Sequence, residues 1–211
     1  MKTKILKMEG ENIGPEPLVM ISDILDGDGV MAYPTETFYG LGVLALSEKA
    51  IEKVYRLKER ERGKPLSVII ADLAMAEKIA VSLPPLFRPL AGEFWPGPLT
   101  LVVQAKPLFP SNMLGRDRSL AMRVPAVSWL RALVRHLGAP ITATSANISG
   151  QREISTSDDV IAAFQGTVDL IIDGGRTPGG RPSTIVDLTG ARPLILRAGA
   201  VPASALRKYL S

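Results

Sequence analysis

Cysteine is absent from this chain of 211 residues, and histidine occurs once, as His136. The lack of cysteine excludes disulfides, thiolate nucleophiles, iron–sulfur clusters and zinc–thiolate sites. A single histidine excludes a metal site built from several histidines. His136 could serve a Ser-His-Asp triad, but the apolar periodicity around it favours a residue near a helix end that caps carbonyl groups. The chemistry must therefore come from oxygen, amide and cationic groups.

Long apolar runs and a secretory signal are lacking as well. No apolar run approaches the roughly 20 residues that span a bilayer, and the basic N-terminal segment 1–10 has neither an apolar core nor a small-residue cleavage site. We therefore expect a cytoplasmic protein that does not engage a membrane. The length, with 46% hydrophobic and 22% charged residues, predicts one globular domain over residues 1–211.

Positive charge is in modest excess and is unevenly placed. The net charge is +4, and the window 53–64 alone holds six basic and two acidic residues. A second basic cluster contains Arg116, Arg118, Arg123, Arg131 and Arg135. Two such patches indicate an anionic partner, either nucleotide phosphate or nucleic acid, although a solvated helix face has the same composition.

Short apolar runs rich in Val, Ile and Leu alternate with amphipathic stretches, which predicts one mixed α/β layer structure. Expected strands are 4–8, 30–34, 41–46, 66–71, 99–105, 119–124, 140–144, 168–172, 184–188 and 193–197. Expected helices are 17–26, 47–58, 72–82, 85–94, 126–137, 157–165 and 202–210. Asp72 and Ser157 are candidate N-caps, and Gly138 and Gly166 are candidate helix stops. The Gly- and Pro-rich segment 173–182 is interpreted as a mobile loop.

Polar residues follow the predicted strand at 30–34, in the run YPTETFYGLG of residues 33–42. If the chain stays extended, Thr35 and Thr37 face the same side. Gly40 and Gly42 would let a ligand approach the backbone closely. A polar turn in which both threonines satisfy local backbone groups is the alternative.

Lys58 and Arg60 lie at the end of an amphipathic stretch and are followed by Gly63 and Pro65, which stop a helix. An extended exit would bring both basic side chains to one side, where they could hold a polyphosphate. Basic residues at a helix C-terminus also complement the helix dipole, and this alternative has comparable weight.

The predicted strand at 140–144 continues into small hydroxyl and amide residues, including Ser145 and Asn147, before Gly150. Ser145 and Asn147 share a face if this segment is extended. Their side chains are suited to hydrogen bonds with phosphate or carboxylate oxygens. A turn with local caps would use the same residue types.

Taken together, seven ordered segments resemble the YrdC-like family. They are YPTETFYGLG (33–42), KER…KPL (58–66), WPGPLTLVV (95–103), RVP (123–125), ATSANISG (143–150), STIVDLT (183–189) and ILRAGA (195–200). The resemblance covers about residues 12–203, and it implies a twisted open mixed sheet flanked by helices with a basic concave cavity. Because the chain ends soon after ILRAGA, it looks like the single-domain form of the family.

The resemblance implies an L-threonylcarbamoyladenylate synthase, a nucleotidyltransferase that joins L-threonine, bicarbonate and ATP, with Mg²⁺, and releases pyrophosphate. Its product would feed the threonylcarbamoylation of tRNA position 37 through a downstream tRNA threonylcarbamoyl transferase. tRNA or double-stranded RNA is a further candidate partner.

Site roles are also carried over from the matching segments. The implied L-threonine site is Thr35, Thr37 and Arg123. The implied catalytic set, which contacts ATP phosphates, is Lys58, Arg60, Ser145 and Asn147. The implied nucleotide site is Arg60, Lys64, Ser119, Ser145, Asn147, Ser183 and Arg197. The chain departs from the common pattern at Lys64, Ile69, Ser119 and Ala143.

This reaction suits the composition, because the carbamate formed on threonine is itself the nucleophile. The protein needs only to position the substrates and neutralise phosphate charge. Asp173, Asp187 or the phosphates themselves could hold the Mg²⁺, and no residue is assigned as a metal ligand.

Two other functions compete with the synthase. A non-catalytic protein that binds double-stranded RNA or tRNA would show the same basic patches, although the 5% content of aromatic residues disfavours base stacking. A carbamoyl-transferase accessory domain within a larger enzyme would share the same segments.

Overall fold

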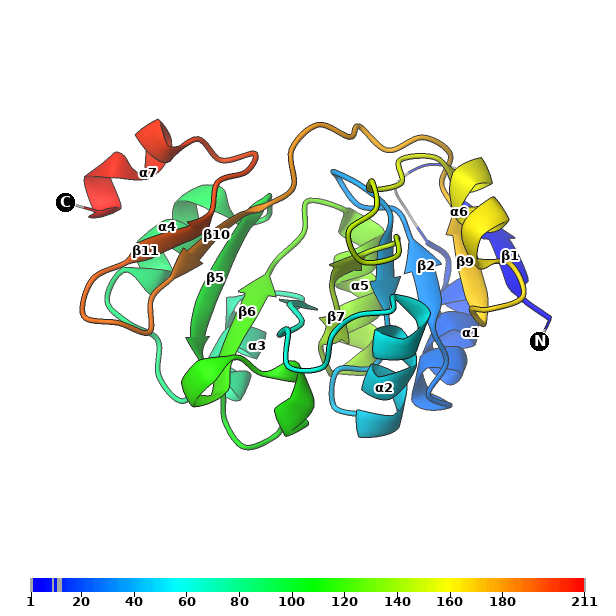
Figure 1. The fold of residues 1–211 in the computed structure, drawn as a ribbon, viewed down its shortest axis with the longest axis horizontal. Coiled ribbons are helices and arrows are strands. Elements are labelled where there is room, and N and C mark those ends of the chain that lie inside the picture. The colour runs from blue at the N-terminus through cyan, green and yellow to red at the C-terminus, as the bar shows by residue number, and fades with distance from the viewer. Residues whose placement is uncertain (1, 9, 11–12, 211) are drawn as a thin grey trace.

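The computed structural model describes residues 2–8, 10 and 13–210. Their strands form two mixed sheets that lie side by side (Figure 1). The first has the order β1 (Lys4–Lys7), β9 (Leu170–Asp173), β2 (Met31–Tyr33), β3 (Gly40–Gly42) and β8 (Thr144–Ser145). The second has the order β11 (Leu194–Arg197), β10 (Thr184–Asp187), β5 (Leu99–Gln104), β6 (Ser119–Arg123), β4 (Val68–Ile69) and β7 (Ile141–Thr142). The mixed α/β class is confirmed, with its strands divided between two sheets.

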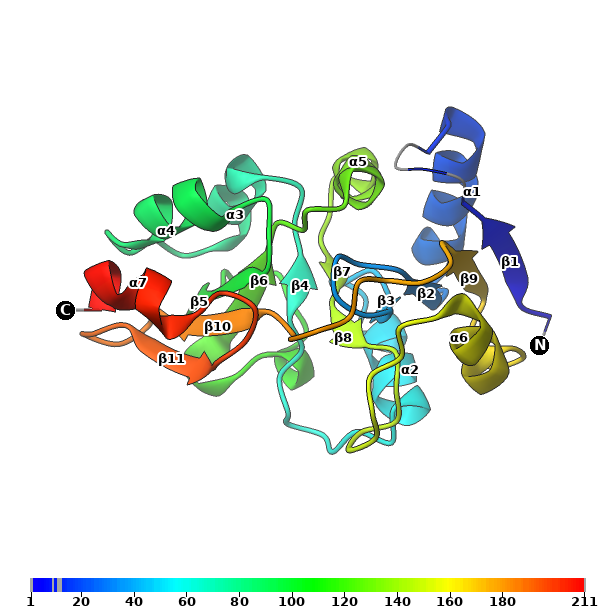
Figure 2. The same cartoon turned by 90° about the horizontal axis from the view of Figure 1, so that it is seen from above.

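Seven α-helices flank these sheets in the part of the chain that the structure describes. They are α1 (Pro15–Asp26), α2 (Glu48–Leu57), α3 (Leu73–Ile79), α4 (Phe87–Phe94), α5 (Ser128–Leu137), α6 (Ser157–Phe164) and α7 (Ala203–Leu210). Figure 2 shows α1 and α5 on one side of the first sheet and α2 and α6 on the other. None of these helices is long and apolar enough to cross a membrane.

The core has two clusters that correspond to the two sides of the first sheet. Ile21 and Leu25 of α1 recur one turn apart and pack with Leu130 and Leu133 of α5 in the smaller cluster. The larger cluster extends from α2 and α6 to the second sheet and its helices. Apolar periodicity therefore selects the buried face of each helix, while its partner is set by the chain topology.

Helix ends follow local hydrogen-bonding chemistry. Asp72 caps α3 by accepting from the Met75 amide at 3.0 Å, and Gly138 ends α5 with a left-handed φ of 64°, so both predictions are confirmed. The prediction of Ser157 as an N-cap is wrong. Thr156 has the extended backbone of a cap and accepts from the Asp159 amide, which makes Ser157 the first helical residue.

All predicted strands and helices have counterparts, most of them shorter than expected. Sequence periodicity missed β8, because two residues are too few to show alternation. It also missed two short 3₁₀ helices, Ser111–Met113 and Arg116–Arg118. His136 lies in the last turn of α5, as expected.

Residues 174–183 connect β9 of the first sheet with β10 of the second and run along the upper edge of the molecule in Figure 1. The Gly179 amide donates to the Thr37 carbonyl at 2.8 Å, and the Thr177 amide donates to the Ser155 carbonyl at 2.8 Å. These bonds attach the connection to the polar segment 33–42 and to Ser155, which follows the polar segment 143–150.

Candidate functional site

A cavity of about 400 Å³ is lined by residues of both sheets and of the loops between them. The sequence-predicted residues in its lining are Thr35, Thr37, Arg60, Lys64, Arg123, Ser145, Ser183 and Arg197. These positions are scattered over 163 positions of the chain, from 35 to 197, so only the tertiary structure brings them together. Four of them are basic, and an anion is the complementary ligand.

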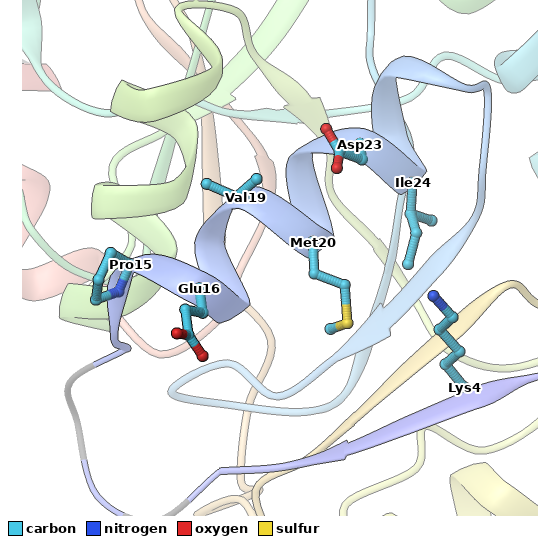
Figure 3. A pocket seen from close by; sticks show the side chains of 7 residues that line it. All are labelled: Lys4, Pro15, Glu16, Val19, Met20, Asp23 and Ile24. Atoms are coloured by element: carbon cyan, nitrogen blue, oxygen red, sulfur yellow. The ribbon is translucent and has the colours of Figure 1, made fainter.

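A larger hollow of about 550 Å³ lies elsewhere, between α1 and β1. Figure 3 shows Met20 and Ile24 of α1 pointing toward the side occupied by Lys4 of β1. This hollow is open and mostly apolar, and Lys4 is the one basic residue among the described residues that line it. Because anion-binding groups converge in the cavity between the sheets, the candidate site is that cavity.

Thr35 and Thr37 are buried and turn their hydroxyls toward each other, with Oγ1 atoms 3.1 Å apart. Thr35 Oγ1 donates to the Phe38 carbonyl at 2.7 Å and accepts from the Thr37 amide at 3.1 Å. The hydroxyl proton of Thr35 is thus used locally, so Thr37 donates in the contact between the two hydroxyls. Thr37 Oγ1 therefore keeps lone pairs that can accept a hydrogen bond from a ligand.

Gly40 and Gly42 both leave room for the ring of Tyr33. A Cβ atom on Gly42 would lie 2.7 Å from the Tyr33 ring, and one on Gly40 would lie 3.0 Å from it. The expectation that both glycines make room for a ligand is therefore wrong for Gly42, whose space is taken by the ring. Burial raises the pKa of the Tyr33 hydroxyl, which donates to the Thr142 carbonyl at 2.9 Å.

Arg123 ends β6 and is buried, with 8% of its side chain exposed. Its Nη1 lies 3.0 Å from Glu36 Oε1. Glu36 stands between the two cavity-lining threonines but is not itself part of the described lining. Glu36 was not singled out from the sequence, because alternation along an extended segment would place it on the side opposite Thr35 and Thr37. In the structure, residues 36–38 form bends.

Lys58 is almost fully buried, at 2% exposure. Its ammonium group donates to the Ser145 carbonyl, to the Asn147 carbonyl at 2.6 Å and to Asn147 Oδ1 at 3.2 Å. Burial, with a smaller contribution from the positive charge of Arg60, lowers the pKa of Lys58 to about 8, and the negative charge of Glu153 opposes this shift.

The predicted extended exit after α2 is wrong. Lys58 is helical, with φ −91° and ψ −4°, and Glu59 is left-handed, with φ 49°. This turn sends Lys58 beneath the segment 145–147 while Arg60 lines the cavity. The two basic side chains therefore diverge, and Lys58 organises the cavity wall from behind.

Ser145 and Asn147 do share hydrogen bonds, as the predicted common face suggests. Asn147 Oδ1 accepts from Ser145 Oγ at 2.5 Å, and Asn147 Nδ2 donates to the Gln151 carbonyl at 2.6 Å. Ser145 lines the cavity, whereas Asn147 is outside its described lining. The amide of Asn147 thus links Lys58, Ser145 and the loop that follows. Lys58 is also absent from the described lining, so the implied contacts of Lys58 and Asn147 with ATP phosphates stay predictions.

Ser183, directly before β10, and Arg197, the last residue of β11, form a second polar cluster. Arg197 donates through Nε and Nη2 to the Ser183 carbonyl, at 3.0 and 2.8 Å, and through Nη2 to Ser183 Oγ at 2.9 Å. Thr100, which the sequence analysis missed, lies 2.8 Å from Ser183 Oγ and also lines the cavity. Burial lowers the pKa of Arg197, and the charge of Arg123 contributes to the shift.

Arg60 and Lys64 stand at the solvent side of the cavity. Arg60 Nη2 donates to the Pro65 carbonyl at 3.1 Å. Lys64, whose side chain is 59% exposed, pairs with Glu61 at 3.1 Å. Ser119 is not among the described residues that line the cavity, so its implied contact with the nucleotide remains a prediction.

Carboxylates are scarce around the cavity, which bears on Mg²⁺. Glu153 is the single acidic residue among the described residues that line it. Asp173 accepts from the Gly175 amide and Asp187 from Thr189, both outside that lining. No cluster of three or more His, Cys, Asp or Glu occurs in residues 2–8, 10 and 13–210. The protein side chains thus fit a metal that arrives bound to phosphate better than a resident metal.

Comparisons with known proteins identify the family of this chain. The sequence profile of the Sua5/YciO/YrdC family, described as "Telomere recombination", matches residues 23–199. The chain belongs to this family. A threonylcarbamoyl-AMP synthase of Pyrococcus abyssi is 39% identical over 86% of this chain and 53% of its own length. A putative threonylcarbamoyl-AMP synthase of Methanocaldococcus jannaschii is 34% identical over 99% of both chains.

A solved structure shares the whole fold. The structure of P. abyssi Sua5 complexed with L-threonine has a TM-score of 0.91 and 34% identity, and the match covers 100% of this chain and 61% of that one. This chain spans about half the length of the P. abyssi and Bacillus subtilis curated relatives that it matches.

Proposed function

We propose that this chain joins L-threonine, bicarbonate and ATP into threonylcarbamoyl-AMP and releases pyrophosphate. The observation that carries the proposal is the convergence in one cavity of a threonine hydroxyl pair and Arg123 with Arg60 and Arg197. The threonine pair and Arg123 suit an amino acid, and Arg60 and Arg197 suit a polyphosphate. The activity in the names of the relatives and the L-threonine complex of P. abyssi Sua5 support the same reaction.

The amino-acid end is built from Arg123 and the two threonines. The guanidinium of Arg123 complements a carboxylate. Thr37 Oγ1 offers lone pairs, because its own proton is donated to Thr35. A substrate with a hydroxyl donor meets this acceptor, whereas valine would leave it unpaired.

In the proposed reaction, the amino nitrogen of threonine forms a bond to the carbon of bicarbonate-derived CO₂ and loses a proton to give a carbamate. A carbamate oxygen then attacks the α-phosphorus of ATP, and the electron pair of the broken P–O bond leaves with pyrophosphate. No side-chain nucleophile is needed. Arg60, Lys64 and Arg197 hold and neutralise phosphate oxygens, and the hydrogen-bonded wall keeps the reactants in line.

A bound Mg²⁺ ion supplies further neutralisation of phosphate charge in such reactions. Since Glu153 is the lone carboxylate in the described lining, we expect the ATP phosphates to provide most of its ligands. This chain would act as a nucleotidyltransferase in the cytoplasm. Its product would be passed to a tRNA threonylcarbamoyl transferase that modifies position 37 of tRNA.

The decisive experiment follows pyrophosphate while each substrate is omitted in turn from a mixture of ATP, Mg²⁺, L-threonine and bicarbonate. We expect release only when threonine and bicarbonate are both present. Equally fast release from ATP alone, or no release under any combination, would contradict the proposal. The alternative of a non-catalytic protein that binds tRNA or double-stranded RNA is not favoured by the names of the relatives.

A further inference from the structure

The ion pair between Glu36 and Arg123 connects two segments that are 87 positions apart and lies against the cavity. The Glu36 side chain is 16% exposed and that of Arg123 is 8% exposed. A buried ion pair is a weak source of stability, because desolvation of two charges offsets much of their attraction. Its presence here calls for a role beyond holding the fold together.

The geometry of the pair restricts Arg123 in a specific way. Glu36 Oε1 accepts from Nη1 alone at 3.0 Å, and Glu36 Oε2 is buried without a hydrogen-bond partner among the described residues. The contact is therefore single-pronged. Because the guanidinium is planar and rigid, fixing one nitrogen sets the direction of the other two without occupying them.

Electrostatics gives an independent reason for a carboxylate at this point. Arg123 and Arg197 carry the same charge, and the charge of Arg123, after burial, contributes to the lowered pKa of Arg197. Both side chains line the cavity. Without a counter-charge, Arg123 would tend to turn away from Arg197, and Glu36 opposes this movement.

We propose that Glu36 is a positioning residue that fixes the orientation of the Arg123 guanidinium and thereby makes the site selective for a free α-carboxylate. Glu36 acts through Arg123, since it is outside the described cavity lining. This inference rests on the proposed function, in which Arg123 receives the carboxylate of L-threonine. Glu36 has the same negative charge as the substrate carboxylate, so its proposed role is to orient Arg123 and not to attract the substrate.

The test measures binding of L-threonine, of L-threoninamide and of ATP, each alone, by calorimetry. The variants are Glu36→Gln, which removes the charge at constant size, and Glu36→Asp, which keeps the charge but withdraws it by one methylene. Glu52→Gln is the matched control, because Glu52 pairs with Arg62 at 2.9 Å and neither residue is in the described cavity lining.

We expect Glu36→Gln to weaken threonine binding by about tenfold and to change ATP binding by less than about twofold. Threoninamide lacks the carboxylate, so its binding should change little, and the preference for threonine over threoninamide should shrink. Glu36→Asp should fall between Glu36→Gln and the unchanged protein. Glu52→Gln should alter none of these affinities.

Unchanged or tighter threonine binding in Glu36→Gln would overturn the proposal, as would an equal loss for all three ligands. If Glu36→Gln does not fold, as judged by its melting temperature, the comparison of Glu36→Asp with the unchanged protein decides in the same way. A lack of threonine binding by the unchanged protein would instead overturn the proposed function. The two failures are therefore distinguishable.

Discussion

The floor and the rim of the cavity are held by different kinds of contact. We call the buried layer behind the cavity wall the floor: its residues Lys58 and Asn147 are outside the described lining, are 2% and 8% exposed, and are linked to each other by hydrogen bonds. At the rim, the side chains of Lys64 and its partner Glu61 are 59% and 73% exposed. Buried, satisfied groups lock geometry, whereas exposed charges are screened and contribute little individually. The floor therefore sets the shape of the site, and the rim attracts anions.

The largest effect should follow Lys58→Met, which removes the floor's central donor. The carbonyls of Ser145 and Asn147 would lose a charged donor, and each buried unpaired group costs about 1–3 kcal/mol. We expect at least about a hundredfold loss of kcat/KM for ATP together with a lower melting temperature. Lys53→Met is the matched control, because Lys53 of α2 also donates to a backbone carbonyl, that of Asp28, at 2.6 Å. Similar losses in both variants would show that Lys58 has no special role in the site.

Arg60→Ala should give the next largest effect. If Arg60 reaches phosphate oxygens, its loss should cost about 2 kcal/mol or more of transition-state stabilisation for ATP use, with little change in thermal stability. Arg56→Ala provides the comparison, since Arg56 is an exposed basic residue in the last turn of α2, four residues before Arg60. Steady-state kinetics against ATP would measure the difference. A loss of folding with unchanged specific activity would assign Arg60 to the helix end instead.

Substrate choice tests the amino-acid end of the cavity, which Thr35, Thr37 and Arg123 line. Valine leaves the Thr37 acceptor unpaired, at a cost of about 1–3 kcal/mol, while serine loses one methyl group, worth roughly 1 kcal/mol. Serine should therefore be the better of the two poor substrates. Competition kinetics with threonine, serine and valine would decide. Valine used as well as serine would show that no buried polar group reads the hydroxyl.

The pH dependence offers a sharper test of Lys58. With a pKa of about 8, the ammonium is charged below pH 8 and has three donors for its three oxygen partners. Above pH 8 the neutral amine has two donors, and its lone pair faces an oxygen. Activity should thus fall as pH rises through about 8, with up to a tenfold loss per pH unit.

Two substitutions check that assignment. In Lys58→Arg the charge persists over this range, so the alkaline decline should disappear from whatever activity remains. In Glu153→Gln the decline should begin at lower pH, because the charge of Glu153 raises the pKa of Lys58. An alkaline decline that is identical in all three proteins would assign it to another group.

The smallest effect is expected at the rim, for Lys64→Ala. An exposed lysine already paired with Glu61 should contribute less than about 1 kcal/mol to ATP use. The contribution should vanish at high salt, where such charges are screened. A salt-independent loss as large as that of Arg60→Ala would show that Lys64 contacts the phosphates directly.

Much of the fold could be predicted from the sequence because its signals are local. Apolar periodicity located the seven helices, and hydroxyl and glycine chemistry located caps such as Asp72 and Gly138. The N-cap of α6 was expected one residue too late, at Ser157, because Thr156 has the same kind of hydroxyl group. The division into two sheets was not predicted, since strand order depends on contacts between distant segments.

The candidate site was predictable in composition but not in geometry. Thr35 was singled out by the residue pattern around it, and Arg123 and Arg197 were assigned through the family resemblance; all three line one cavity. The tertiary structure alone decided that Lys58 lies behind the wall, because a left-handed turn at Glu59 separates it from Arg60. It also paired Glu36 with Arg123 across 87 positions. Residue type determines which interactions a side chain can make, and only the folded chain determines which partners come within reach.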